Sequence, residues 1–74
     1  MSKEDKFIIY CMERYRFHKK ISGATVADLF DRYCIYDFLK KYFESMHTMS
    51  ENAIIQDIDE YIGIAWSRFQ SLER

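Results

Sequence analysis

The chain has 74 residues, 49% of them hydrophobic and 18% aromatic, with two glycines and no proline. This composition excludes a disordered, collagenous or low-complexity chain, and two cysteines cannot form a disulfide scaffold, so one globular domain over residues 1–74 is expected. Eleven basic and twelve acidic side chains give a net charge of −1, which argues against a general nucleic-acid binder.

The first two predicted helices cover residues 2 to about 18 and 23 to about 33. Apolar side chains recur in both at the i, i+3, i+4, i+7 spacing of a buried helix face. In the first helix these are Ile8, Cys11, Met12 and Tyr15, and in the second Val26, Leu29, Phe30 and Tyr33. Ser2 and Ser22 are the expected N-caps, because a hydroxyl can accept a hydrogen bond from a free backbone N–H.

A break near residues 34–36 separates the second helix from a third. The side chains of the third helix that are expected in the core are Ile35, Phe38, Leu39, Tyr42, Phe43 and Met46. The loop of residues 47–49 precedes the last helix. Thr48 and Glu51 have the spacing of a capping box, and Ser50 is the competing cap.

The last predicted helix runs from about residue 50 to residue 72 and is the longest. Its apolar stripe contains Ile54, Ile55, Ile58, Tyr61, Ile62, Ala65, Trp66 and Phe69. Gly63 costs roughly 1 kcal/mol there relative to alanine, so a kink or an end near it stays open. Strand signals are poor throughout, and the sequence therefore predicts an all-α single domain of about four helices.

Charge is unevenly placed along the chain. Residues 14–20 hold four bases and no acid, and residues 51–60 hold four acids and no base. Bases near a helix C-terminus and acids near an N-terminus are favoured by the helix dipole, so solvated helix ends are the simplest interpretation. The alternative is a dipolar surface that orients a partner.

The cysteines and histidines are the candidate ligands for a metal ion. Cys11, Cys34, His18 and His47 have the composition of a zinc site but not the close local pairs that such sites use, so no metal or cofactor is expected. Cys11 is expected in the core and Cys34 in packing between helices.

His47 with Thr48, and the acids Asp57, Asp59 and Glu60, are candidates for acid–base catalysis. A histidine at a helix C-terminus more often stabilises the last carbonyls, and the acids fit a solvated face or an ion pair with the basic end of the first helix. We therefore expect no catalytic residues and no enzyme. A small hydrolase or metal protein built on these groups remains a third hypothesis.

The helices near residues 23–33 and 36–46 have the arrangement of a helix-turn-helix. The second of them offers Lys40 and Lys41 but also Asp37 and Glu44, and it has no Arg, Asn or Gln to contact base edges. Nucleic acid is therefore an unfavoured partner, and a small DNA-binding autoregulator is the alternative function.

Several large apolar side chains lie off the core stripes or on the last helix. The candidate partner-contact residues are Tyr10, Phe17, Tyr36, Ile64, Trp66 and Phe69. So many exposed apolar side chains in a small domain indicate a contact surface for another protein or for a second copy of the chain.

The apolar run after the charged first six residues ends at Met12 and is too short for a membrane span. We therefore expect a cytoplasmic protein with reduced thiols.

Five short motifs carry a resemblance to a known family. They are Phe7-Ile8-Ile9-Tyr10-Cys11-Met12-Glu13, Ser22-Gly23, Asp37-Phe38-Leu39, Met46-His47-Thr48 and Asp57-Ile58-Asp59-Glu60-Tyr61-Ile62. With them the chain resembles the small bacterial proteins of domain of unknown function 3791 from Phe7 to Ile62, and residues 63–74 form an extension. The family usually has a glycine near Cys34 and an acid near Thr25, so the turn and the helix cap are expected to differ here.

The resemblance implies a compact helical fold with no established activity, in which the roles of His47, Thr48, Asp57 and Asp59 are unknown. Family members are often encoded beside a protein that resembles ADP-ribosyltransferase toxins, in loci that look like toxin–antitoxin pairs. The implied function is a non-enzymatic protein-interaction module that neutralises the adjacent enzyme.

Overall fold

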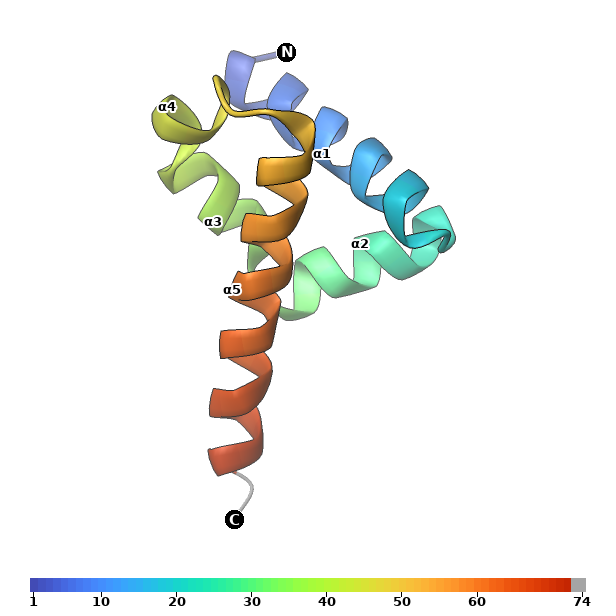
Figure 1. The fold of residues 1–74 in the computed structure, drawn as a ribbon, viewed down its shortest axis with the longest axis vertical. Coiled ribbons are helices and arrows are strands. Elements are labelled where there is room, and N and C mark those ends of the chain that lie inside the picture. Colours follow the sequence, from blue (N-terminus) through green and yellow to red (C-terminus); the bar gives the residue numbers. More distant parts are fainter. Residues whose placement is uncertain (73–74) are drawn as a thin grey trace.

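Five helices follow one another along the chain (Figure 1). The computed structural model describes the backbone of residues 1–72 and the side chains of residues 1–66. The helices are α1 (Lys3–Lys19), α2 (Gly23–Arg32), α3 (Ile35–Lys41), α4 (Phe43–Met46) and α5 (Glu51–Leu72). The predicted all-α class is confirmed, and the C-terminal helix is the longest.

Serine caps begin both α1 and α2 as predicted. Ser2 Oγ accepts from the backbone N–H of Asp5 at 3.1 Å, and Ser22 Oγ accepts from that of Thr25 at 3.1 Å. Between them, α1 ends at Lys20, which adopts the left-handed conformation and donates its N–H to the Arg16 carbonyl. This turn directs α2 back against α1.

The predicted third helix is two helices, because the backbone leaves helical geometry at Tyr42, where φ is −106°. Phe43 and Met46 are buried, whereas Tyr42, at the boundary between the two helices, is 44% exposed. The prediction that Tyr42 lies in the core is therefore wrong.

The two cysteines differ in their surroundings. Cys11 is fully buried, as predicted. Cys34 is exposed at the α2–α3 corner, where it has a left-handed backbone with φ 56° and ψ 38°. The prediction that Cys34 packs between helices is wrong, because this turn places its side chain in solvent.

The start of α5 decides between the two expected caps. Ser50 Oγ accepts from the backbone N–H of Ala53 at 3.2 Å, whereas the Thr48 hydroxyl donates to the Ser45 carbonyl. Ser50 is therefore the cap, and the predicted capping box is wrong. The helix then continues through Gly63 without a break to Leu72.

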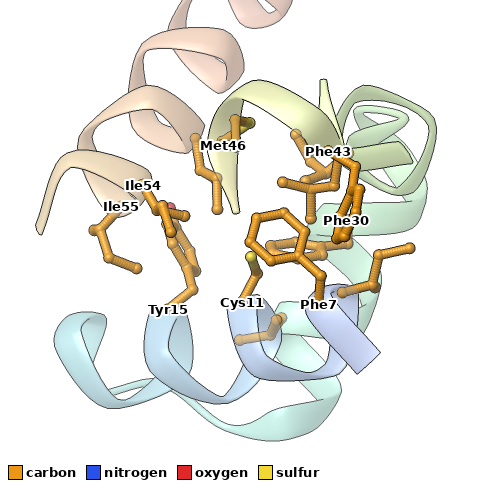
Figure 2. Packing of buried hydrophobic residues seen from close by; sticks show 13 residues of the cluster. Phe7, Cys11, Tyr15, Phe30, Phe43, Met46, Ile54 and Ile55 are labelled. Atoms are coloured by element: carbon orange, nitrogen blue, oxygen red, sulfur yellow. The ribbon is translucent and has the colours of Figure 1, made fainter. Parts of the chain in front are cut away.

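The core lies where α1, α2, α3, α4 and the first half of α5 meet (Figure 2). Among residues 1–66, its buried members are Phe7, Ile8, Cys11, Tyr15, Val26, Phe30, Ile35, Leu39, Phe43, Met46, Ile54, Ile55 and Ile58. Phe7 meets Phe43 edge to face, with ring centroids 5.4 Å apart. Helix α1 is the central element, because α2, α3 and α5 all pack on it.

Among the side chains of residues 1–66, those of α5 that join the core lie in its first half. Ile58 is the last buried one in this range, and Tyr61 and Ile62 are the last partly buried ones packed on the core. At 1.5 Å per residue the 22-residue helix is about 33 Å long, whereas the two shorter extents of the molecule are 25 and 23 Å. The second half of α5 consequently projects from the other helices (Figure 1). None of the described helices combines the length and apolarity needed to cross a bilayer.

Candidate functional site

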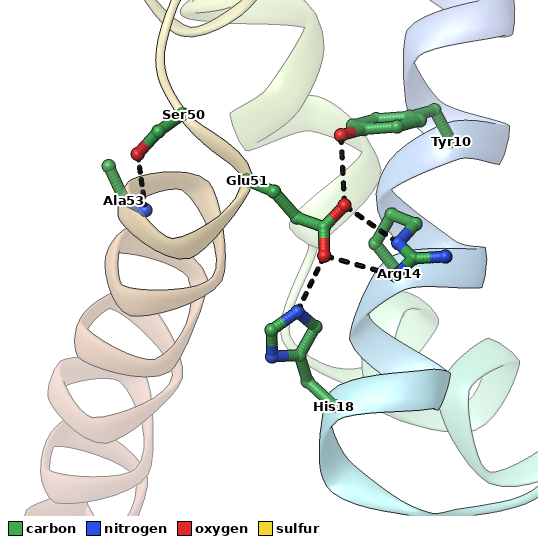
Figure 3. A network of polar contacts seen from close by, with 6 residues as sticks. All are labelled: Tyr10, Arg14, His18, Ser50, Glu51 and Ala53. Carbon is green, nitrogen blue, oxygen red and sulfur yellow. Dashed lines mark hydrogen bonds and ion pairs between the residues drawn. The ribbon is translucent and has the colours of Figure 1, made fainter.

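The Glu51 carboxylate at the start of α5 is the centre of a polar cluster (Figure 3). Tyr10 Oη donates to its Oε1 at 3.3 Å, and His18 Nε2 lies 2.7 Å from its Oε2. Arg14 contacts both oxygens, with Nε 2.8 Å from Oε1 and Nη2 donating to Oε2 at 3.1 Å. The three partners are four residues apart on α1, so one face of this helix presents them to one carboxylate.

These contacts stabilise the ionised form of Glu51. The hydrogen bond from His18, followed by that from Arg14, holds the pKa of the carboxyl below its usual value. About a third of the surface of each of these side chains is accessible to solvent, so water screens the ion pair. The cluster therefore positions α5 on α1 rather than forming a dry reactive centre.

A second link between the same helices lies further along both. The Tyr15 hydroxyl donates to Asp59 Oδ1 at 2.7 Å, and Lys19 forms an ion pair with the same carboxylate. Burial, followed by the hydrogen bond to Asp59, raises the pKa of Tyr15. The buried phenol thus stays protonated and donates to an acid at the surface.

For Asp59, the ion pair with Lys19 is confirmed as one of the two predicted environments of these acids. Sequence reasoning considered Glu51 as a helix cap and as one of the acids of residues 51–60, and it missed the role of Glu51 at the cluster. The available signal was the spacing of Tyr10, Arg14 and His18, which places three hydrogen-bonding side chains on one helix face. That spacing does not identify the carboxylate, because Glu51 is 33 residues from His18 in sequence.

The predicted contact residues fall into different environments. Phe17, Ile64 and Trp66 are 65%, 56% and 46% exposed. Tyr10 is 43% exposed, but its hydroxyl contacts Glu51. Tyr36 is half-buried, with its ring 5.8 Å from that of Phe30. Phe69 lies outside the residues whose side chains are described.

His47 and Thr48 contact the helix that precedes them. His47 Nδ1 lies 2.9 Å from the Phe43 carbonyl, and its ring stacks on the Phe43 ring with centroids 4.7 Å apart. The Thr48 hydroxyl donates to the Ser45 carbonyl. Both side chains therefore contact carbonyls of α4, and the Phe43 carbonyl also accepts the backbone N–H of His47.

The structure does not bring the residues considered for a metal site together. In the part of the chain with described side chains, no three histidine, cysteine, aspartate or glutamate residues are grouped so as to hold a metal ion. Asp59 contacts α1, and Asp57 is half-buried on another face of α5. Burial also raises the pKa of the Cys11 thiol to about 12, so it is neutral at ordinary pH and a poor nucleophile or ligand.

Residues 6–63 match the family described as "Protein of unknown function (DUF3791)". The chain belongs to this family. The match covers the expected range from Phe7 to Ile62 and stops where α5 leaves the core. No curated protein and no solved structure matches the chain.

Two helix boundaries have distinct local features. Cys34 occupies a left-handed position, a conformation in which glycine has no steric penalty. The first turn of α2 has no acidic residue, and its N-cap is Ser22, whose hydroxyl lies 2.8 Å from that of Thr25.

Proposed function

We propose that this DUF3791 protein is a non-enzymatic interaction module of the cytoplasm. Its partner in this proposal is the enzyme encoded beside it, whose activity it neutralises. The observation that carries the proposal is the second half of α5, which continues beyond the core with Ile64 and Trp66 exposed. Apolar side chains that project from a small domain are typical of protein contacts.

The packing of α5 supports a partner at this place. Most of the stability of a helix in a protein comes from packing of its apolar face. The core supplies such packing as far as Ile62. A protein surface that covers Ile64 and Trp66 would extend this packing beyond Ile62. The apolar area buried there would stabilise the complex by about 25 cal/mol per Å².

The polar residues support a non-enzymatic role. Glu51 and Asp59 contact side chains of α1, and His47 contacts a backbone carbonyl of its own helix. These three side chains thus each have a contact within the fold. The proposal therefore assigns recognition to the apolar surface and not to the polar clusters.

Co-expression with the product of the adjacent gene, followed by size-exclusion chromatography, tests the proposal. The two proteins should elute together, and Ile64→Gln should separate them. Ile9→Gln is the matched control, because Ile9 is a 47% exposed isoleucine on α1, away from the second half of α5. Independent elution of the wild-type proteins at micromolar concentration, or equal effects of the two substitutions, would count against it.

A further inference from the structure

The corner between α1 and α2 forms a shallow depression on the surface. It is lined by Arg16, Phe17, His18, Lys20 and Ile21. The left-handed turn at Lys20 creates it, because this turn ends α1 and brings Ile21 back toward the core. In Figure 1 the corner lies where the blue helix α1 passes into α2, far from the free end of α5.

An exposed aromatic ring forms one side of this depression. Phe17 is 65% exposed, more than any other described aromatic side chain. The Arg14 guanidinium lies 4.8 Å from the centroid of its ring, and the His18 ring meets it edge-on at 6.1 Å. The ring is thus held at the surface by its neighbours rather than drawn into the core.

The cations around the Phe17 ring differ in whether a carboxylate pairs with them. Arg14 and Lys19 form ion pairs with carboxylates of α5. Arg16 pairs with Glu13 of its own helix, where both side chains are exposed and water screens the pair. Within the described part of the chain, Lys20 has no ion pair, and the first turn of α2 beside it has no acid. Of these four cations, Lys20 is thus the one that no described carboxylate neutralises, whereas the whole chain has a net charge of −1.

From this combination we propose that the α1–α2 corner binds an acidic segment of the protein partner. An apolar side chain of that segment packs on Phe17 and Ile21, and flanking carboxylates pair with Arg16 and Lys20. This inference rests on the proposed function and adds a second contact to it. The cations around the exposed Phe17 ring would attract an acidic segment, because charge complementarity speeds and orients association.

A defined peptide tests the corner without the unidentified partner. The probe is an acetylated peptide in which leucine and phenylalanine are flanked by glutamates, titrated into the isotope-labelled full chain and followed by amide chemical shifts. The shifts should cluster at Phe17, Lys20 and Ile21 and shrink with added salt. The same peptide with lysines in place of glutamates should leave them unchanged.

Substitutions locate the binding. Lys20→Glu should weaken it by roughly three- to tenfold, since it replaces an attraction at the surface with a repulsion. Lys6→Glu is the matched control, because it makes the same charge change at the other end of α1. Phe17→Ala, at an exposed site that the fold does not need, should weaken binding as well. Equal binding by Lys20→Glu and wild type, or shifts at the corner with a single-stranded oligonucleotide and not with the peptide, would overturn the proposal.

The complex with the adjacent enzyme separates the two proposals. If the complex forms and Lys20→Glu leaves its affinity unchanged, the corner proposal is wrong and the proposed function stands. If the acidic peptide binds at the corner while no complex with the adjacent enzyme forms, the proposed partner is wrong and the acidic-segment site stands.

Discussion

Replacing Cys34 with glycine should make the protein more stable. Cys34 has φ 56° and ψ 38° in the turn that joins α2 to α3, and its side chain is exposed. The substitution therefore removes the steric cost of a Cβ in a left-handed conformation and removes no buried packing.

The expected gain follows from two opposing terms. A side chain in the left-handed conformation costs roughly 1–2 kcal/mol, whereas the greater freedom of glycine in the unfolded chain costs about 0.5–1 kcal/mol. The net stabilisation therefore lies between about 0 and 1.5 kcal/mol, and the midpoints of the two terms differ by about 0.75 kcal/mol. For a chain of this length, that midpoint corresponds to a rise in Tm of roughly 3–6 °C.

Urea unfolding followed by far-UV circular dichroism, with a reducing agent present, measures this difference. Cys34→Ala is the matched control, because it removes the thiol but keeps the Cβ, and its stability should stay within about 0.5 kcal/mol of the wild type. The reasoning fails if Cys34→Gly is no more stable than Cys34→Ala.

Three further predictions concern α5. Gly63→Ala should stabilise the isolated chain by about 1 kcal/mol, because a Cβ added there meets nothing within 4 Å and alanine favours the helix; a lower urea midpoint would contradict this. Ile58→Ala should destabilise the fold by roughly 2–5 kcal/mol, because the side chain is fully buried, and a loss below that range would mean that the core does not close around it. Glu51→Gln should lower the Tm at neutral pH. Since the folded-state pKa of Glu51 lies below its unfolded value, its contribution is present above about pH 4.5 and is lost as the pH falls through the folded value, so the melting curves of variant and wild type should converge in acid. A difference that is independent of pH would show that the carboxylate charge is not the cause.

The helices could be predicted because their signals are local. The repeat of Ile8, Cys11 and Tyr15 defines one buried face of α1, and the serines before α1 and α2 define where these helices start. The break at Tyr42 was missed because neither glycine nor proline marks it. Packing of Phe43 against Phe7 accompanies the break, and this contact joins distant parts of the sequence.

Only those features of the candidate site that depend on a single side chain could be predicted from the sequence. The exposure of Phe17 and Ile64 follows from their positions off the apolar stripes. The burial of Tyr36 depends on Phe30 of another helix, and the role of Glu51 depends on the face of α1 that receives it. Such pairings are set by tertiary structure, which the spacing within one helix does not contain.

The Glu51 cluster also has a consequence for the order in which the chain folds. Helix α2 packs on α1, its neighbour in sequence, whereas Glu51 must meet side chains 33 to 41 residues before it. Because closing a longer loop costs more chain entropy, we expect the docking of α5 to follow the packing of α2 on α1. The direction in which the second half of α5 projects is then set when Glu51, together with the buried isoleucines of α5, engages the rest of the fold.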